Sequence, residues 1–258
     1  MKKGLKPVIV SAAVLLLGAL CLLIWDKNSE EQGLKTCAGV RVEYEDDFIF
    51  VSQEDVEGYL RSDYGHIIGQ RLDSVDLIKV EEILDAKSAV FKAEAYTTPD
   101  GYLNVRIRQR EPVVRFQKGS YGFYADGRGF IFPLQSNYTS RVPIIDGNIP
   151  LDVAAGYKGE PGTDREKEWL ASAIRLVNFI KESRTWSENI SQMTVNADGD
   201  IVMVPREGKE KFIFGGPEDP EAKFSRIERY YNTIAPARGK DTYSKVIVKY
   251  DGQIVCRK

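Results

Sequence analysis

Residues 50–60 read FVSQEDVEGYL and contain the signals that start a capped helix. Ser52 is a preferred N-cap residue, and Asp55 follows three positions later, where an acidic side chain completes a capping box. Val51 and Val56 have the spacing of a hydrophobic staple around this cap. The stretch therefore predicts a helix that begins directly after Ser52.

The same pattern returns in the stretch LDSVDLIKVEEIL, residues 72–84. Asp73 is the expected cap of a second helix, and Asp76 follows three positions later. The apolar residues that supply the staple and then continue one helical face are Leu72, Leu77, Val80 and Leu84. Two short helices in succession are predicted.

Alternating apolar and polar residues, the pattern of a half-buried strand, stand on both sides of this helix pair. They occupy residues 40–45 before it and residues 91–96 and 103–108 after it, with a Pro-Asp-Gly turn at residues 99–101. The order strand, helix, helix, strand, strand over residues 36–110 resembles a POTRA domain, a module of exported proteins that docks other polypeptides. Several small α+β modules share this order, so the order alone does not identify the module.

Residues 111–258 form a second predicted module. Turn signals of the Asp-Gly type recur beside apolar or alternating runs, at Asp126, Asp146, Asp198 and Asp251. This recurrence is typical of a mainly antiparallel sheet. Two helices interrupt it: an apolar stripe over residues 169–180 follows the candidate cap Asp164, and the second helix begins at Asp219 and Pro220.

The N-terminal segment predicts a membrane anchor. No charged residue occurs from Val8 to Trp25, and the basic residues of the segment precede this run. A helix over the run would be roughly 27 Å long, close to the thickness of the hydrocarbon core. The positive-inside rule keeps residues 1–7 in the cytoplasm and exports the rest of the chain across the cytoplasmic membrane. The residues assigned to the anchor include Val8, Leu15, Leu16, Leu22, Ile24 and Trp25.

A cleaved signal peptide is the alternative for this segment. Such a peptide has a shorter apolar region that ends in small residues at the cleavage site. Here the apolar run continues past Cys21 through bulky residues to Trp25, which favours the anchor. The predicted fold class is therefore α+β, with one transmembrane helix at 8–25, a β-α-α-β-β module, and a mainly antiparallel β domain with two helices.

Composition argues against several kinds of site. Lys and Arg total 36 and Asp and Glu total 38, so the net charge of −2 gives no cationic surface for nucleic acid. The only histidine is His66, and Cys37 and Cys256 are expected to be free thiols, so zinc sites are not predicted. The Gly127-Arg128-Gly129 segment is interpreted as a hairpin turn rather than a phosphate loop. Acidic pairs such as Glu81 and Glu82 are interpreted as solvated helix faces, and no catalytic, cofactor or metal residue is assigned.

Four stretches together resemble the FtsQ/DivIB family of bacterial cell-division proteins. Residues 50–86 resemble the capped helix pair of that family, and residues 109–116 and 124–132 resemble its module junction and first β-domain hairpin. Residues 245–255 resemble its terminal strand. The family commonly carries an Arg-Tyr pair where Lys249 and Tyr250 stand here, and lysine lacks the planar fork of arginine.

The resemblance implies a non-enzymatic division scaffold. Its partners would be the small bitopic proteins FtsB (DivIC) and FtsL, with other division proteins docking on the POTRA module. An exported segment of a partner would pair with an open strand around residues 245–255, because a free sheet edge accepts a foreign strand. The residues assigned to this contact are Val246, Val248, Lys249, Tyr250 and Ile254.

Two other functions share the predicted topology. The first is an anchored envelope enzyme that acts on peptidoglycan, which would need a nucleophile, an acid/base pair or a metal. The second is a POTRA-bearing secretion or transport component. A membrane barrel needs many lipid-facing strands, and the length left after the first module, interrupted by two helices, does not supply them.

Overall fold

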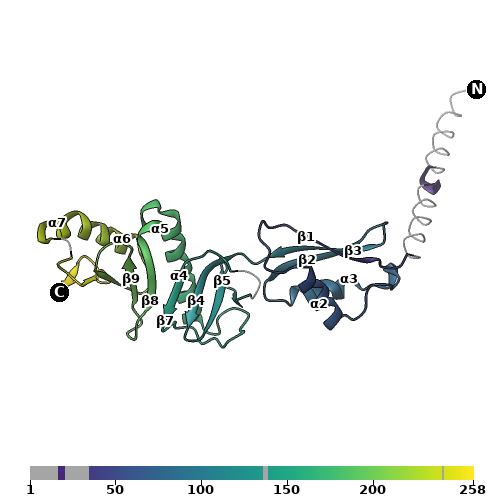
Figure 1. The fold of residues 1–258 in the computed structure, drawn as a ribbon, viewed down its shortest axis with the longest axis horizontal. Helices are drawn as coiled ribbons and strands as arrows, with labels where there is room; N and C mark the ends of the chain where they lie inside the picture. Colours follow the sequence, from purple (N-terminus) through teal and green to yellow (C-terminus); the bar gives the residue numbers. More distant parts are fainter. Residues whose placement is uncertain (1–16, 21–34, 136–138, 240) are drawn as a thin grey trace, which may run out of the picture. The chain divides into compact units, whose positions relative to one another are not determined.

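The computed structural model describes residues 17–20, 35–135, 139–239 and 241–258. Two compact units divide the chain between Gln109 and Arg110, and each is treated by itself (Figure 1). Within the described residues, no helix has both the length and the apolar character needed to cross a membrane. The predicted anchor residues Val8, Leu15, Leu16, Leu22, Ile24 and Trp25 lie outside the described residues.

The first unit has the predicted order of strand, helix, helix, strand, strand. Its sheet has the order β1-β3-β2, with β1 parallel and β2 antiparallel to the central strand β3. Both helices lie on one side of this sheet (Figure 1). The elements are β1 (Gly39–Tyr44), α2 (Gln53–Asp63), a 3-10 turn (Leu72–Ser74), α3 (Leu77–Asp85), β2 (Val90–Thr97) and β3 (Tyr102–Gln109).

The predicted cap of α2 is confirmed. The Ser52 hydroxyl accepts a hydrogen bond from the Asp55 N–H at 3.2 Å, and the Asp55 carboxylate accepts one from the Ser52 N–H at 2.9 Å. Val51 and Val56 are both buried beside this capping box. Local sequence signals therefore set the start of α2.

Replacing Ser52 with Ala should lower the free energy of unfolding of the first unit by about 1 kcal/mol, because the cap loses its acceptor. Ser52→Thr keeps a hydroxyl at the same position and should lose much less. Urea unfolding monitored by circular dichroism measures both changes. Equal stability of Ser52→Ala and the wild type would show that the capping box contributes nothing.

The predicted cap of the second helix is wrong by three residues. Helix α3 begins at Leu77, and its N-cap is Asp76, whose carboxylate accepts from the Lys79 N–H at 3.0 Å. Asp73 instead lies in the 3-10 turn, where the Arg71 guanidinium binds its carboxylate at 3.1 and 2.5 Å. This ion pair engages Asp73 in the turn, and Asp76 caps the helix.

The second unit contains one sheet of nine strands in the order β12-β11-β10-β9-β8-β7-β4-β5-β6. The strands are β4 (Pro112–Lys118), β5 (Tyr121–Asp126), β6 (Ile131–Pro133), β7 (Ile144–Gly147), β8 (Ile190–Val195), β9 (Ile201–Pro205), β10 (Lys211–Gly215), β11 (Lys245–Ile247) and β12 (Val255–Arg257). The helices are α4 (Asp164–Glu182), α5 (Arg184–Asn189), α6 (Pro220–Arg229), a π-helical turn (Tyr230–Ile234) and α7 (Ala235–Arg238).

The sheet is mixed, and five of its eight neighbouring pairs are antiparallel, as the turn signals predicted. Three neighbouring pairs are parallel: β4 with β7, β7 with β8, and β10 with β11. Parallel neighbours need a long crossover, and α4 joins β7 to β8 just as α6 joins β10 to β11. The predicted helices are therefore the crossovers of the sheet. The short helix α5 was not predicted, and α4 is capped by Thr163 rather than by Asp164.

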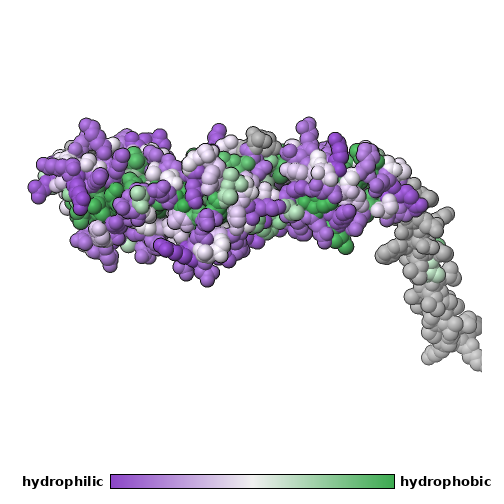
Figure 2. All heavy atoms as spheres, turned by 90° about the horizontal axis from the view of Figure 1, so that it is seen from below, coloured by the Kyte–Doolittle hydropathy of each residue, from purple (hydrophilic) through white to green (hydrophobic). Residues whose placement is uncertain are grey.

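The helices cover one face of this sheet. The rings of Phe179 in α4 and Phe224 in α6 stack with their centroids 5.2 Å apart, and the centroid of Phe224 lies 5.3 Å from that of Phe214 in β10. We call the opposite side the open face. Near β5 the open face is covered by a loop, since the buried Tyr124 hydroxyl accepts from the Ser140 N–H at 3.1 Å. Figure 2 shows apolar atoms among hydrophilic ones at the end of the second unit that carries the C-terminus.

Candidate partner-binding edge

The predicted terminal strand, residues 245–255, is in fact two strands joined by a turn at Asp251 and Gly252. Strand β11 lies between β10 and β12, so both of its edges are already paired. Val246 pairs with Phe212 on one side and with Cys256 on the other, and its side chain is fully buried. The expectation that Val246 lies on an open ladder is therefore wrong.

Val248 is also part of the interior. Its side chain is fully buried, and its N–H donates to the Ile213 carbonyl of β10 at 3.0 Å. The Val248 carbonyl accepts from the Arg226 Nε of helix α6 at 2.8 Å. Neither main-chain group of Val248 is open to a foreign strand.

The other three predicted residues have different surroundings. Ile254 is half-buried and packs against the core of the second unit. Lys249 forms an ion pair with Asp200 at 2.7 Å. Tyr250 is 46% exposed, and the Lys249 ammonium lies 5.5 Å from the centre of its ring. Tyr250 alone among the five predicted residues offers a large exposed side chain.

The Lys249–Asp200 pair predicts a change of stability at alkaline pH. The hydrogen bond from Lys249 to Asp200 raises the pKa of the Lys249 ammonium. A lysine whose pKa is higher in the folded chain stabilises the fold fully below its unfolded pKa of about 10.4. This stabilisation is lost as the pH rises through the pKa of the folded state. Because the pair is partly exposed, we expect less than about 1 kcal/mol.

Urea unfolding of the wild type and of Lys249→Met measures this contribution. The difference between the two proteins should be constant from about pH 7 to 9 and should disappear as the pH rises through the raised pKa of Lys249 in the folded chain. A difference that persists unchanged at alkaline pH would show that the contribution of Lys249 does not come from its charge.

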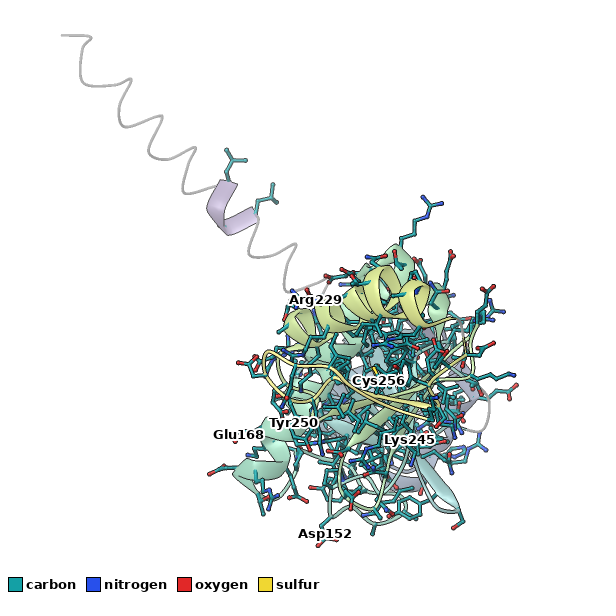
Figure 3. All side chains as sticks on the ribbon, turned by 90° about the vertical axis from the view of Figure 1, so that its left-hand side faces the viewer. Asp152, Glu168, Arg229, Lys245, Tyr250 and Cys256 are labelled. Carbon is teal, nitrogen blue, oxygen red and sulfur yellow. The ribbon has the colours of Figure 1, made fainter. Side chains whose placement is uncertain are left out.

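The open edge of the nine-stranded sheet is β12. It is the last strand in the order, and β11 is its only neighbour among the described residues. At the opposite end of the sheet, Ile131 of β6 exchanges two main-chain hydrogen bonds with Gly159, at 2.8 and 3.0 Å. Gly159 therefore occupies the outward main-chain groups of Ile131 at that end of the sheet. Figure 3 shows Lys245 of β11, Cys256 of β12, and Tyr250 in the segment that joins the two strands.

The direction of the main-chain groups in β11 follows from two hydrogen bonds to β10. The Ser244 carbonyl accepts from the Lys211 N–H at 2.9 Å, and the Val248 N–H donates to the Ile213 carbonyl. Successive residues of a strand turn their main-chain groups to opposite sides. Even-numbered residues of β11 therefore face β10, and odd-numbered residues face β12.

This alternation identifies the residue that faces outward from β12. Lys245 and Ile247 turn toward β12, where they pair with Arg257 and Val255. Those two residues consequently face inward, and Cys256 between them turns its N–H and C=O toward the unpaired side. The Cys256 side chain is half-buried against the core, and burial raises the pKa of its thiol. The main chain of Cys256, rather than its sulfur, is the feature that a partner would use.

The first unit closes one of its own edges. Strand β2 is an edge strand, and its Ala93 N–H donates to the Asp85 carboxylate at 2.7 Å. The Ala95 N–H likewise donates to the Glu81 carboxylate at 2.8 Å. Both acceptors come from α3, so Glu81 is not simply the solvated residue that the sequence suggested. These carboxylates occupy donors that an added strand on β2 would need.

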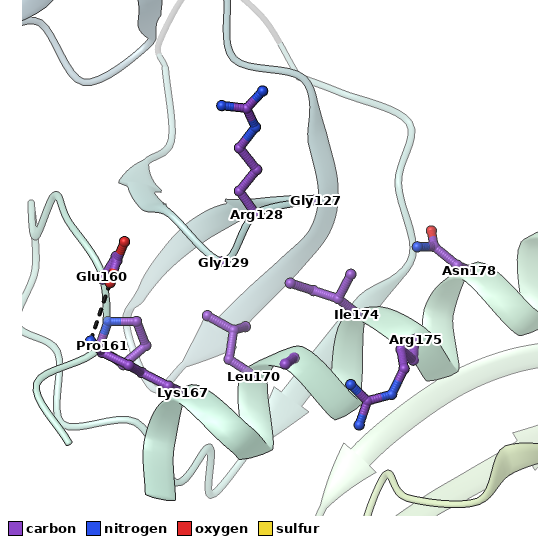
Figure 4. A pocket seen from close by; sticks show the side chains of 11 residues that line it. Gly127, Arg128, Gly129, Glu160, Pro161, Lys167, Leu170, Ile174, Arg175 and Asn178 are labelled. Atoms are coloured by element: carbon purple, nitrogen blue, oxygen red, sulfur yellow. Dashed lines mark ion pairs between the residues drawn. The ribbon is translucent and has the colours of Figure 1, made fainter. Parts of the chain in front are cut away.

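A cavity of about 420 Å³ lies between the β5–β6 turn and helix α4 (Figure 4). The Gly127–Gly129 segment is a turn, as predicted, because the Asp126 carboxylate accepts from the N–H groups of Arg128 and Phe130, both at 2.9 Å. Leu170 and Ile174 line the cavity with an ion pair of Lys167 and Glu160 at 3.2 Å. Among the described residues, no group of three or more His, Cys, Asp or Glu side chains could hold a metal ion.

Comparison with known families identifies both units. A family model described as a POTRA-like domain matches residues 35–108, and a model described as FtsQ/DivIB, C-terminal related, matches residues 111–257. The second match covers more than half of the chain. The chain belongs to the FtsQ/DivIB family.

Membership of the FtsQ/DivIB family indicates a scaffold role in cell division, and its members are non-catalytic division proteins. No curated protein matches the sequence of this chain. The FtsQ/DivIB match extends over β11 and β12, so the open edge described above lies within the matched domain. The predicted open strand, residues 245–255, covers the interior strand β11 and only the first residue of the edge strand β12, and the Asp251–Gly252 turn is the sequence signal that separates the two.

Proposed function

We propose that this FtsQ/DivIB protein is a bitopic division scaffold that captures a partner strand on β12. In this proposal residues 8–25 anchor the chain in the cytoplasmic membrane, and residues 1–7 stay in the cytoplasm. The exported units recruit and position FtsB/DivIC-like and FtsL-like proteins, and thereby control septal peptidoglycan synthesis. The POTRA-like unit contacts further division proteins.

The observation that carries this proposal is the open main-chain ladder at Cys256. A strand that adds to β12 gains main-chain hydrogen bonds of about 1 kcal/mol each, and side chains on both faces add to this. The edge is short, so stable capture also needs contacts beyond the ladder. Tyr250, which is exposed beside the turn that leads to β12, is one source of such contacts. The mechanism is positioning, and it requires no bond-making step.

Depletion and complementation in the native bacterium test this function. Cells depleted of the protein should elongate without septa, and a plasmid copy of the wild type should restore division. A copy with Cys256→Pro should reach the membrane but fail to restore septa, whereas Cys256→Ala should restore them. Normal division of depleted cells, or full rescue by Cys256→Pro, would contradict the proposal.

A further inference from the structure

The strand register aligns four apolar side chains on the open face. Val202 of β9 stands opposite Ile213 of β10, which stands opposite Ile247 of β11, and Ile247 stands opposite Val255 of β12. All four are half-buried. Neighbours in such a row have their Cβ atoms about 5 Å apart and contact each other. We call these four residues the apolar row, and it ends at the open edge.

A second row runs beside the first. Lys211 stands opposite Lys245, and Lys245 stands opposite Arg257. Each lies two residues from a member of the apolar row, so the two rows share the open face. We call Lys211, Lys245 and Arg257 the basic row. All three are exposed, and none forms an ion pair in the described part of the chain.

This arrangement is unfavourable for the isolated sheet. Like charges directly opposite each other on neighbouring strands destabilise the pair. A charge on an edge strand alone has a simple role, since it discourages the pairing of edges between molecules. That role accounts for Arg257 on β12. It does not account for Lys211 and Lys245, which lie on interior strands.

We propose that the two rows select an acidic extended segment as the strand that docks on β12. On the open face this segment places an apolar side chain beside Val255 and a carboxylate beside Arg257, so that it continues both rows. The inference rests on the proposed function, because it specifies the chemistry of the partner at that edge. A second copy of this chain is disfavoured there because it brings the same positive charges.

The basic row makes capture dependent on salt. Arg257 is nearest to the added strand, and Lys245 and Lys211 add a longer-range attraction. Because all three are exposed, dissolved ions weaken this attraction strongly at distances beyond about 8 Å at physiological ionic strength. Charge pairs of this kind act on the rate of association and on partner choice. Reversing the charge of Arg257 removes one attraction to that carboxylate and adds one repulsion, so it should weaken capture by about tenfold, which corresponds to about 1.4 kcal/mol.

Capture by the full-length chain in detergent micelles tests the inference. The probe is the exported segment of the FtsB/DivIC-like protein of the same bacterium, made as a labelled synthetic peptide. Arg257→Glu should weaken binding about tenfold in low salt, and the remaining binding should weaken less with added NaCl than that of the wild type, because only Lys245 and Lys211 still attract the peptide. Arg165→Glu is the control, because Arg165 is an exposed arginine of the same unit, in the first turn of α4.

A peptide with its Asp and Glu residues changed to Lys should show the opposite preference, binding Arg257→Glu better than the wild type. Cys256→Pro distinguishes docking of the peptide on the edge of β12 from selection of the peptide by charge. If Cys256→Pro abolishes capture while Arg257→Glu matches the wild type, the edge is the docking site and the inference about charge is wrong. If the wild type binds no peptide, or if neither variant changes capture, the proposed function at this edge is wrong as well.

Discussion

The full-length chain with Cys256→Pro is expected to fold and to lose capture of its division partner. Proline is tolerated on an edge strand where its nitrogen faces away from the ladder, and the alternation in β12 gives Cys256 this orientation. The preceding residue, Val255, already has the extended conformation that a following proline requires. The host sheet should therefore keep its hydrogen bonds.

The partner strand should not tolerate the same change. Proline removes the outward N–H of residue 256 and places its ring where a partner carbonyl would approach. We expect capture to fall by at least about tenfold, since one main-chain hydrogen bond of about 1 kcal/mol is lost and the ring adds a steric clash. Binding of the immobilised partner segment to the chain in micelles measures the loss.

Cys256→Ala is the matched control for this variant. Alanine also removes the thiol and its partial packing, but it keeps the N–H. Capture by Cys256→Ala should equal that of the wild type, and thermal unfolding should show that both variants are folded. Equal capture by the proline and alanine variants would place the docking site away from β12.

The largest loss of stability is expected from Val248→Pro. This substitution removes the N–H that donates to Ile213 and disturbs the pairing of β11 with β10. It also replaces a fully buried side chain next to the carbonyl that binds Arg226. The free energy of unfolding of the second unit should fall by about 3 kcal/mol or more.

Urea unfolding of Val248→Pro and Cys256→Pro in parallel measures the contrast. The two prolines stand eight residues apart, and only the first should shift the unfolding midpoint strongly. An unshifted midpoint for Val248→Pro would mean that Val248 does not belong to the interior ladder. A similar large shift for both variants would mean that β12 is not an edge.

The sequence predicted the first unit well because its signals are local. The Ser52 cap, the Asp55 carboxylate and the Pro-Asp-Gly turn each act within a few residues, and the structure contains all three. The error at Asp73 instead of Asp76 arose because only Asp73 has an acidic residue three positions later, whereas Asp76 is followed at that spacing by Lys79. The ion pair of Asp73 with Arg71 and the hydrogen bond from the Asp76 N–H to the Tyr64 hydroxyl, at 2.8 Å, are features that cap spacing does not contain.

The second unit was predicted less well because strand order is not local. The apolar pattern of residues 245–250 fits a buried strand with one neighbour or with two, and only the pairing of Val246 with Cys256 shows that there are two. The open edge was therefore assigned to β11 instead of β12. The parallel pairs were missed for a similar reason, since a helix in the sequence does not show whether it returns the chain to a parallel neighbour.

Amide hydrogen exchange of the main chain at Cys256, with and without the partner segment, tests strand addition at β12 most directly. We predict that this amide exchanges rapidly in the free chain and at least about tenfold more slowly in the complex, because the partner supplies its missing acceptor. The Val246 amide, already held in the interior ladder, should exchange slowly in both states. An unchanged rate at Cys256 in the saturated complex would contradict the account.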